Sequence, residues 1–181
     1  EFRQIARFML AEALGFQALL LFCEARRPAQ IDPSGEFVPL LEQDHQLWDG
    51  PLLRNAYELL GKASALLQNG PFQIEAAIQA AHCYRAHTGE VPWKDIAHLY
   101  QALVTEHPTM GARVGMAVAV AQAENSPARG LAILQAIPSE LVQNFQPYWT
   151  AISYLFEKQG RTDEAIECVR RALGLTTQPR L

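Results

Sequence analysis

Apolar residues recur at three- and four-residue intervals along most of this chain, the spacing that places them on one face of an α-helix. The strongest stripe begins the sequence and continues to Cys23. Its members are Phe2, Ile5, Phe8, Met9, Ala13, Phe16 and Leu20. Pro28 follows, and proline lacks the backbone N–H that a helix interior needs. The pattern therefore predicts a long amphipathic first helix that ends before Pro28.

Most of the remaining chain repeats this helical spacing between turns that contain proline or glycine. A second helix is expected over 43–67, interrupted at Gly50, and a third over 72–87. The later helices are expected over 93–107, 110–123, 127–136, 147–159 and 162–175. The sequence thus predicts an all-α fold of at least six helices, packed as successive antiparallel pairs, with no sheet larger than a hairpin.

The last two predicted helices share the spacing of a tetratricopeptide unit, a helix pair that recurs roughly every 34 residues. The turn Gly160–Asp163 separates these helices and supplies a cap for the second one. Weaker copies of the pattern precede this pair, and a single unit cannot bury its own apolar face. We therefore expect a right-handed superhelix of antiparallel helix pairs, with Trp149, Phe156 and Val169 buried between them.

The segment 24–49 interrupts the helical pattern. It contains a basic pair, the turn-forming sequence Asp32–Gly35, a short extended stretch at Glu36–Leu41 and an acidic segment with one tryptophan. A connector of this length inside a compact domain is more often functional than incidental. The expected organisation is a single continuous domain, with N-terminal helices and this connector over 1–70 and helix pairs over 71–181.

Five residues of the connector are candidates for an interaction site. They are Arg26, Arg27, Asp44, Trp48 and Asp49. In a structural interpretation, one of the arginines pairs with one of the aspartates, and Trp48 packs the connector onto the first helix pair. In a functional interpretation, the same residues form a docking surface for another protein or domain. Packing is favoured for the tryptophan, whereas both interpretations stay open for the arginines.

The connector is also where the chain resembles a known family. The sequences CEARRPAQID (Cys23–Asp32) and LLEQDHQLWD (Leu40–Asp49) resemble the C-terminal extension of one group of extracytoplasmic-function (ECF) sigma factors, within the sigma-70 family. The resemblance continues through WKDIAHLYQAL at Trp93–Leu103 and VGMAVAVAQAENSPARGLAIL at Val114–Leu134. His45 departs from the group, which has arginine at this place. An ion pair made by that arginine would be lost or pH-dependent here.

The resemblance implies a regulatory C-terminal domain of an alternative sigma factor, which would control promoter-specific transcription initiation through protein–protein contacts. The implied partners are the sigma-factor core domains and RNA polymerase in the cytoplasm, with a regulatory protein as a further candidate for the repeat groove. The promoter-binding domains of a sigma factor do not fit among these helices. Contacts with DNA would therefore belong only to missing N-terminal domains, and we interpret the chain as a C-terminal fragment.

The alternative is a free-standing helical-repeat scaffold that binds peptides or partner proteins. The two functions differ upstream of Glu1, where only a sigma factor would encode a helical promoter-binding domain and a helix-turn-helix. Neither function requires a reaction site.

Composition and spacing argue against other classes of protein. A net charge of −4 disfavours duplex-DNA binding by this chain, because phosphate neutralisation needs a basic face. The longest apolar run, around Ala18–Phe22, is too short to span a membrane, and three widely separated cysteines suit a reducing compartment. No two histidines have metal-ligand spacing, and no phosphate-binding loop or nucleophile motif is found. We therefore expect no enzyme activity, no cofactor, no metal and no membrane partner.

Overall fold

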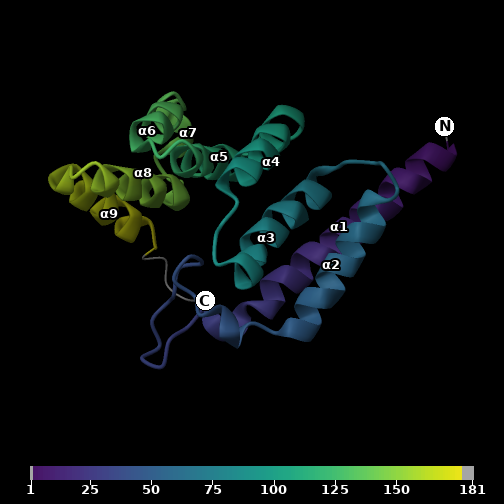
Figure 1. Cartoon of the computed structure of the whole chain (residues 1–181). Helices are drawn as coiled ribbons and strands as arrows, with labels where there is room; N and C mark the ends of the chain where they lie inside the picture. Colours follow the sequence, from purple (N-terminus) through teal and green to yellow (C-terminus); the bar gives the residue numbers. More distant parts are fainter. Residues whose placement is uncertain (1, 177–181) are drawn as a thin grey trace. The chain divides into compact units, whose positions relative to one another are not determined.

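The computed structural model describes residues 2–176 of the chain (Figure 1). Regular structure in that range is helical apart from one isolated β-bridge between Ile31 and Phe37, which confirms the predicted all-α fold. Two short 3-10 turns, η1 (Arg27–Ala29) and η2 (His45–Leu47), precede the second helix. The α-helices are α1 (Phe2–Ala25), α2 (Gly50–Ser64), α3 (Pro71–Thr88), α4 (Trp93–Glu106), α5 (Met110–Ala123), α6 (Pro127–Gln135), α7 (Ser139–Val142), α8 (Gln146–Lys158) and α9 (Thr162–Thr176).

The helices gather into two compact units, Glu1–Pro92 and Trp93–Leu181. In the first unit, α1 packs against both α2 and α3 (Figure 1). The face that α1 buries consists mostly of small residues. Its apolar members are Ala11, Gly15, Ala18, Phe22 and Ala25. These small residues allow a close approach, since a Cβ added to Gly15 would lie 2.7 Å from the Gln73 side chain.

The apolar stripe predicted for the first helix lies on the opposite face of α1 and is exposed. Phe2, Met9 and Leu20 are 84%, 65% and 52% exposed, and Ile5 and Phe16 are exposed as well. A sequence pattern gives the positions of apolar residues around a helix, but it does not say which side the neighbouring helices occupy. Here the neighbours occupy the small-residue face, where backbones can come closest.

The helical stretch at the N-terminus is longer than the apolar run judged from the sequence. The helical stretch Phe2–Ala29 has 28 residues, and by length and composition alone it is long and apolar enough to cross a membrane. In its most apolar window, 28% of the residues are buried. The core helix of a soluble protein and an N-terminal signal sequence pass the same test.

A buried side chain from α1 ties α3 to the first unit. The Glu12 carboxylate accepts hydrogen bonds from the backbone N–H groups of Phe72 (2.9 Å) and Gln73 (3.3 Å) at the start of α3. Gly70 is the N-cap, and a Cβ there would lie 2.2 Å from the Glu12 carboxyl carbon. A carboxylate at a helix N-terminus accepts hydrogen bonds from backbone N–H groups that have no partner within the helix. Its negative charge also interacts favourably with the positive end of the helix dipole. The units consequently divide after Pro92, and not at the boundary expected after residue 70.

The second unit is a series of packed helices, in which α5 contacts α4 and α6 and α8 contacts α9. Phe156 is buried, as expected for an anchor of the last helix pair, whereas Trp149 is only partly buried and its neighbour Tyr148 is buried instead. Val169 is 44% exposed, so its predicted burial was wrong. Cys168 is buried in place of Val169, between the buried Ala165 and Ala172, and Val169 and Leu173 are exposed.

Candidate interaction site

The connector between α1 and α2 contains an ordered hairpin. The Asp32 carboxylate accepts hydrogen bonds from the backbone N–H (2.9 Å) and the hydroxyl (2.7 Å) of Ser34, and the hydroxyl bond is the main reason why the pKa of Asp32 is lowered. Gly35 has a φ of +88°, which glycine adopts without strain. The backbone N–H of Val38 donates to the carbonyl of Gln30 at 2.8 Å and closes the hairpin. The turn predicted at Asp32–Gly35 is therefore confirmed.

Arg85 on α3, which the sequence analysis did not single out, holds the connector in place. Its Nη1 donates to the carbonyl of Leu41 at 2.7 Å. Its Nη2 donates to the carbonyls of Leu40 (2.7 Å) and Gln43 (2.8 Å). A guanidinium presents five donors in a fixed fork, so one arginine can bind several carbonyls. No motif marks such a residue, because its partners are backbone groups 42 to 45 positions away.

Trp48 packs the connector onto the first unit, as the structural interpretation predicted. Its side chain is 6% exposed and lies in a core cluster with residues of α1, α2 and α3. The guanidinium carbon of Arg85 lies 5.1 Å from the centroid of the Trp48 ring, within the range of a cation–π contact. The His45 ring approaches edge-on at 6.2 Å. His45, which stands where the resembled sigma-factor group has arginine, therefore contacts an aromatic ring.

The two arginines of the basic pair have different environments. Arg26 is buried; its Nε donates to the carbonyl of Phe22 (3.1 Å), and its Nη2 donates to Oε1 of Gln79 (2.5 Å). Arg27 is exposed and forms an ion pair with Glu24 at 2.8 Å, one helical turn away. A surface pair of this kind contributes about 0–1 kcal/mol. Arg26 is therefore structural, and Arg27 is available to a partner.

Asp44 and Asp49 are helix caps. The Asp44 carboxylate accepts a hydrogen bond from the backbone N–H of Gln46 at 2.9 Å, at the start of η2. The Asp49 carboxylate accepts one from Leu52 at 2.9 Å, at the start of α2. Within residues 2–176, no ion pair joins either aspartate to the basic pair, so that predicted pairing was wrong. The nearby backbone donors occupy the carboxylates instead.

Neutral groups lie beside the buried Arg26 and the partly buried Arg85. Burial lowers the pKa of His82 to about 4, and the positive charges of Arg26 and Arg85 add to the effect. Burial also raises the pKa of the Cys83 thiol to about 11. Both side chains are uncharged at neutral pH, which suits an interior that already holds two guanidinium groups.

The part of the connector that faces solvent carries apolar side chains among polar ones such as Glu36 and Glu42. Its exposed large side chains are Ile31, Phe37, Leu41 and Leu47, here named the connector surface. Ile31 and Phe37 face each other across the hairpin and are 54% and 68% exposed. The buried candidates, Arg26 and Trp48, position this surface and do not belong to it. These apolar residues form no motif in the sequence. The predicted site residues of the connector were its charged residues and its tryptophan.

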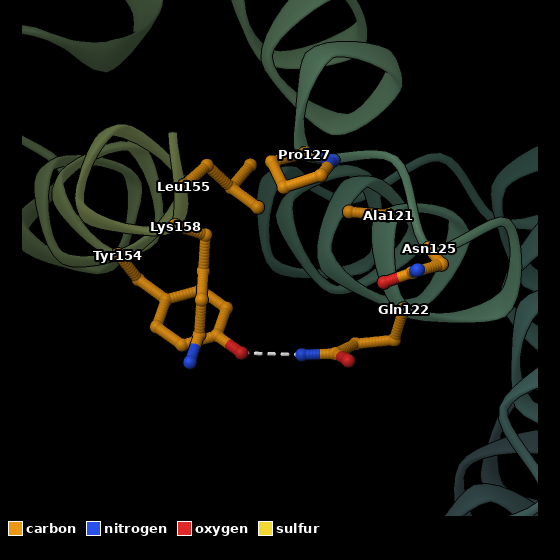
Figure 2. Close-up of a pocket in the computed structure, with 7 residues that line it drawn as sticks. All are labelled: Ala121, Gln122, Asn125, Pro127, Tyr154, Leu155 and Lys158. Carbon is orange, nitrogen blue, oxygen red and sulfur yellow. Dashed lines mark hydrogen bonds between the residues drawn. The ribbon is translucent and has the colours of Figure 1, made fainter. Parts of the chain in front are cut away.

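A pocket of about 190 Å³ lies in the second unit, between the ends of α5 and α8 (Figure 2). Gln122 donates a hydrogen bond to the Tyr154 hydroxyl, and the Lys158 ammonium lies 5.3 Å from the centroid of the Tyr154 ring. Asn125, with a φ of +48°, and Pro127 line another side. No group of His, Cys, Asp and Glu that could hold a metal ion occurs in the described part of the chain.

Comparison with known proteins gives two matches. Residues 4–64, which contain the whole connector, match a family of unknown function (DUF6596). An uncharacterized protein of Rhizobium meliloti (strain 1021) is 34% identical over 166 residues, which cover 92% of this chain and 39% of the relative. The chain thus spans about two fifths of the length of the curated relative that it matches. No solved structure matches the chain.

Proposed function

We propose that this chain is the regulatory C-terminal part of an alternative sigma factor of the ECF group, which controls promoter-specific transcription initiation through protein–protein contacts. The family matched by residues 4–64 is known as a C-terminal domain of sigma-70-like factors, which supports this assignment. The greater length of the Rhizobium relative is consistent with additional domains that would bind DNA. In this proposal, the sigma core or RNA polymerase is the partner, in the cytoplasm.

The observation that carries the proposal is the connector surface. Four apolar side chains are exposed on a segment whose backbone is fixed by Arg85 and by the Asp32 turn. A partner that docks on a pre-ordered segment loses little conformational entropy, so even a small apolar contact gains affinity. The surface also lies inside the region that matches the family. We therefore assign docking to the connector surface, with the exposed Arg27 of the same connector as a candidate polar contact.

We also infer that the second unit is a tetratricopeptide-like superhelix that receives a regulatory protein. Close packing of its helix pairs supports this inference. A Cβ on Gly130 of α6 would lie 2.7 Å from the carbonyl of Ala117 on α5, so only glycine fits there. Ala165 of α9 is buried against α8 in the equivalent way. Small residues at the crossing of two helices are typical of this class of repeat.

The test of the transcription proposal is the double substitution Ile31→Glu and Phe37→Glu in the longer protein. Two charges on the connector surface should reduce transcription from the dependent promoters severalfold, because an apolar contact cannot desolvate them. Leu67→Glu is the matched control, since Leu67 is 78% exposed in the same unit but lies outside the connector. Protein abundance and helix content are measured in parallel. Unchanged transcription by a stably folded double variant contradicts the proposal.

A free-standing scaffold that binds peptides or partner proteins is the second candidate, and the pocket in Figure 2 favours it. Its polar rim of Gln122, Tyr154 and Lys158 over an apolar floor is suited to a partner side chain. In this case Tyr154→Ala should weaken binding of a copurifying partner, while charges on the connector surface change nothing. Binding assays on both variants separate the two functions.

A further inference from the structure

The first unit leaves one apolar face of α1 largely exposed, although the Phe16 ring contacts the Phe72 ring of α3 at a centroid distance of 4.9 Å. The residues of this face, here named the α1 stripe, are Phe2, Ile5, Met9, Ala13, Phe16 and Leu20. At ~100° per residue they fall within an arc of roughly 80°, opposite the small-residue face that packs on α2 and α3. The first turns of α1 extend beyond both of those helices (Figure 1).

The α1 stripe is large enough to be an interface. With the flanking Phe8 and Leu10, it leaves roughly 700 Å² of side-chain area exposed, judged from typical side-chain areas. This exceeds the ~300–600 Å² of the largest apolar patch on a typical monomer and approaches the ~800 Å² that each partner contributes to a standard interface. A shallow hollow between Ile5, Phe8 and Gln68 offers room for an inserted side chain.

The spacing of the stripe suits a straight partner helix. The intervals between successive members are three, four, four, three and four residues, so the spacing over 2–9 recurs 11 residues later over 13–20. An 11-residue repeat corresponds to about 3.67 residues per turn, close to the ~3.6 of an α-helix, so the stripe does not wind around α1. A second helix can therefore follow it from end to end.

The stripe is also complementary to itself when reversed. Suppose that α1 of a second copy runs in the opposite direction and crosses the first α1 at residue 11. Large side chains then meet at both ends of the stripe, and a small side chain meets a flexible one at its centre. The facing pairs are Phe2 with Leu20, Ile5 with Phe16, and Met9 with Ala13. Arg3 and Glu24 flank the stripe on one side, near its opposite ends. Antiparallel pairing places this side of one helix beside the same side of the other, so Arg3 of each copy approaches the end that carries Glu24 of the second copy.

We propose that two copies of this chain associate through the α1 stripe as an antiparallel, two-fold symmetric helix pair. In such an interface the same patch serves both partners, as the reversed pattern requires. A lipid surface fits less well, because the chain has a net charge of −4 and the first three turns of α1 carry only two cationic residues, Arg3 and Arg7. The proposal does not depend on the function assigned to the connector surface.

The oligomeric state of the whole chain, measured by sedimentation velocity through the micromolar range, tests the pairing. The wild type should be a dimer, and Met9→Glu should raise the dissociation constant by at least about a hundredfold, since two buried carboxylates would face the centre of the interface. Leu173→Glu places the same charge on an equally exposed apolar residue of the second unit and should leave the dimer intact. Circular dichroism checks that both variants fold.

The native cysteines distinguish the two orientations. Cys23 is exposed, whereas Cys83 and Cys168 are buried, so a spin label attaches selectively to Cys23. In the antiparallel pair each Cys23 lies 12 residues from the centre, which separates the two labels by roughly 36 Å at ~1.5 Å per residue. In a parallel pair they would be adjacent. A monomeric wild type, a dimer insensitive to Met9→Glu, or a short distance between labels overturns the proposal, as does a monomer that binds neutral lipid vesicles.

Discussion

Arg26, which is buried, and Arg85, which is partly buried, hold the connector through carbonyl and amide oxygens. Arg85 donates to three backbone carbonyls, and Arg26 donates to one carbonyl and to the amide oxygen of Gln79. Carbonyl oxygens carry only partial charge, so each guanidinium keeps its full positive charge inside the first unit. A third cation in this cluster would be repelled and poorly solvated. For that reason His82 is neutral, and its protonation is linked to stability.

Stability should decrease as the pH falls from 6.5 to 4. Above this window His82 is neutral in both the folded and the unfolded chain. Within it, the unfolded chain binds a proton at the ordinary pKa of 6.5, while the folded chain, with a pKa of about 4, does not. The unfolded state is thereby favoured, by at most about 3 kcal/mol at the lower end. Urea unfolding measured at successive pH values gives this free energy.

The variant His82→Gln isolates the contribution of this one group, because glutamine is polar but does not titrate in that window. The difference in unfolding free energy between wild type and variant should change by about 3 kcal/mol between neutral pH and pH 4. Parallel pH profiles for the two proteins would show that His82 is charged or solvated in the folded state.

At the scale of the helices, the sequence predicted where each helix begins and ends better than it predicted which face of the helix is buried. Pro and Gly breaks placed Met110–Ala123 as observed and most other helix ends within one or two residues, since these signals are local. The buried face of α1 was predicted wrongly, because Ala and Gly at a close crossing can be buried in preference to Phe and Met. Arg85 and Glu12 escaped notice for a related reason. Their partners are backbone groups more than 40 residues away.

Glu12→Ala should destabilise the first unit by about 2–3 kcal/mol. The substitution leaves the backbone N–H groups of Phe72 and Gln73 without their acceptor in a buried place at the start of α3. Glu24→Ala is the matched control on the same helix, because Glu24 makes only an exposed ion pair worth about 0–1 kcal/mol. Urea unfolding of both variants measures the difference. Equal losses would contradict a capping role for Glu12.

At the scale of the whole molecule, each unit has its own core. Phe22, Trp48 and Leu59 belong to the cluster of the first unit, and the cluster of the second includes Leu134 and Leu155. The first unit also contains the whole region that matches the family and the connector surface. Docking through the connector and packing of the helix pairs are thus properties of separate parts of the chain. The sequence predicted one continuous domain because its helix pairs were expected to stack without interruption, whereas the structure divides after Pro92.

The two units should therefore fold independently. Separate chains of residues 1–92 and 93–181 each have about 90 residues, within the usual size range of a domain. Each should be helical by circular dichroism and should unfold cooperatively in urea, because each retains its own buried cluster. The chain divided after residue 70 is the informative comparison, since that cut removes α3 from Glu12 and should leave the N-terminal piece poorly folded. An unfolded 1–92 chain, or a stable 1–70 chain, would place the division where the sequence pattern first suggested it.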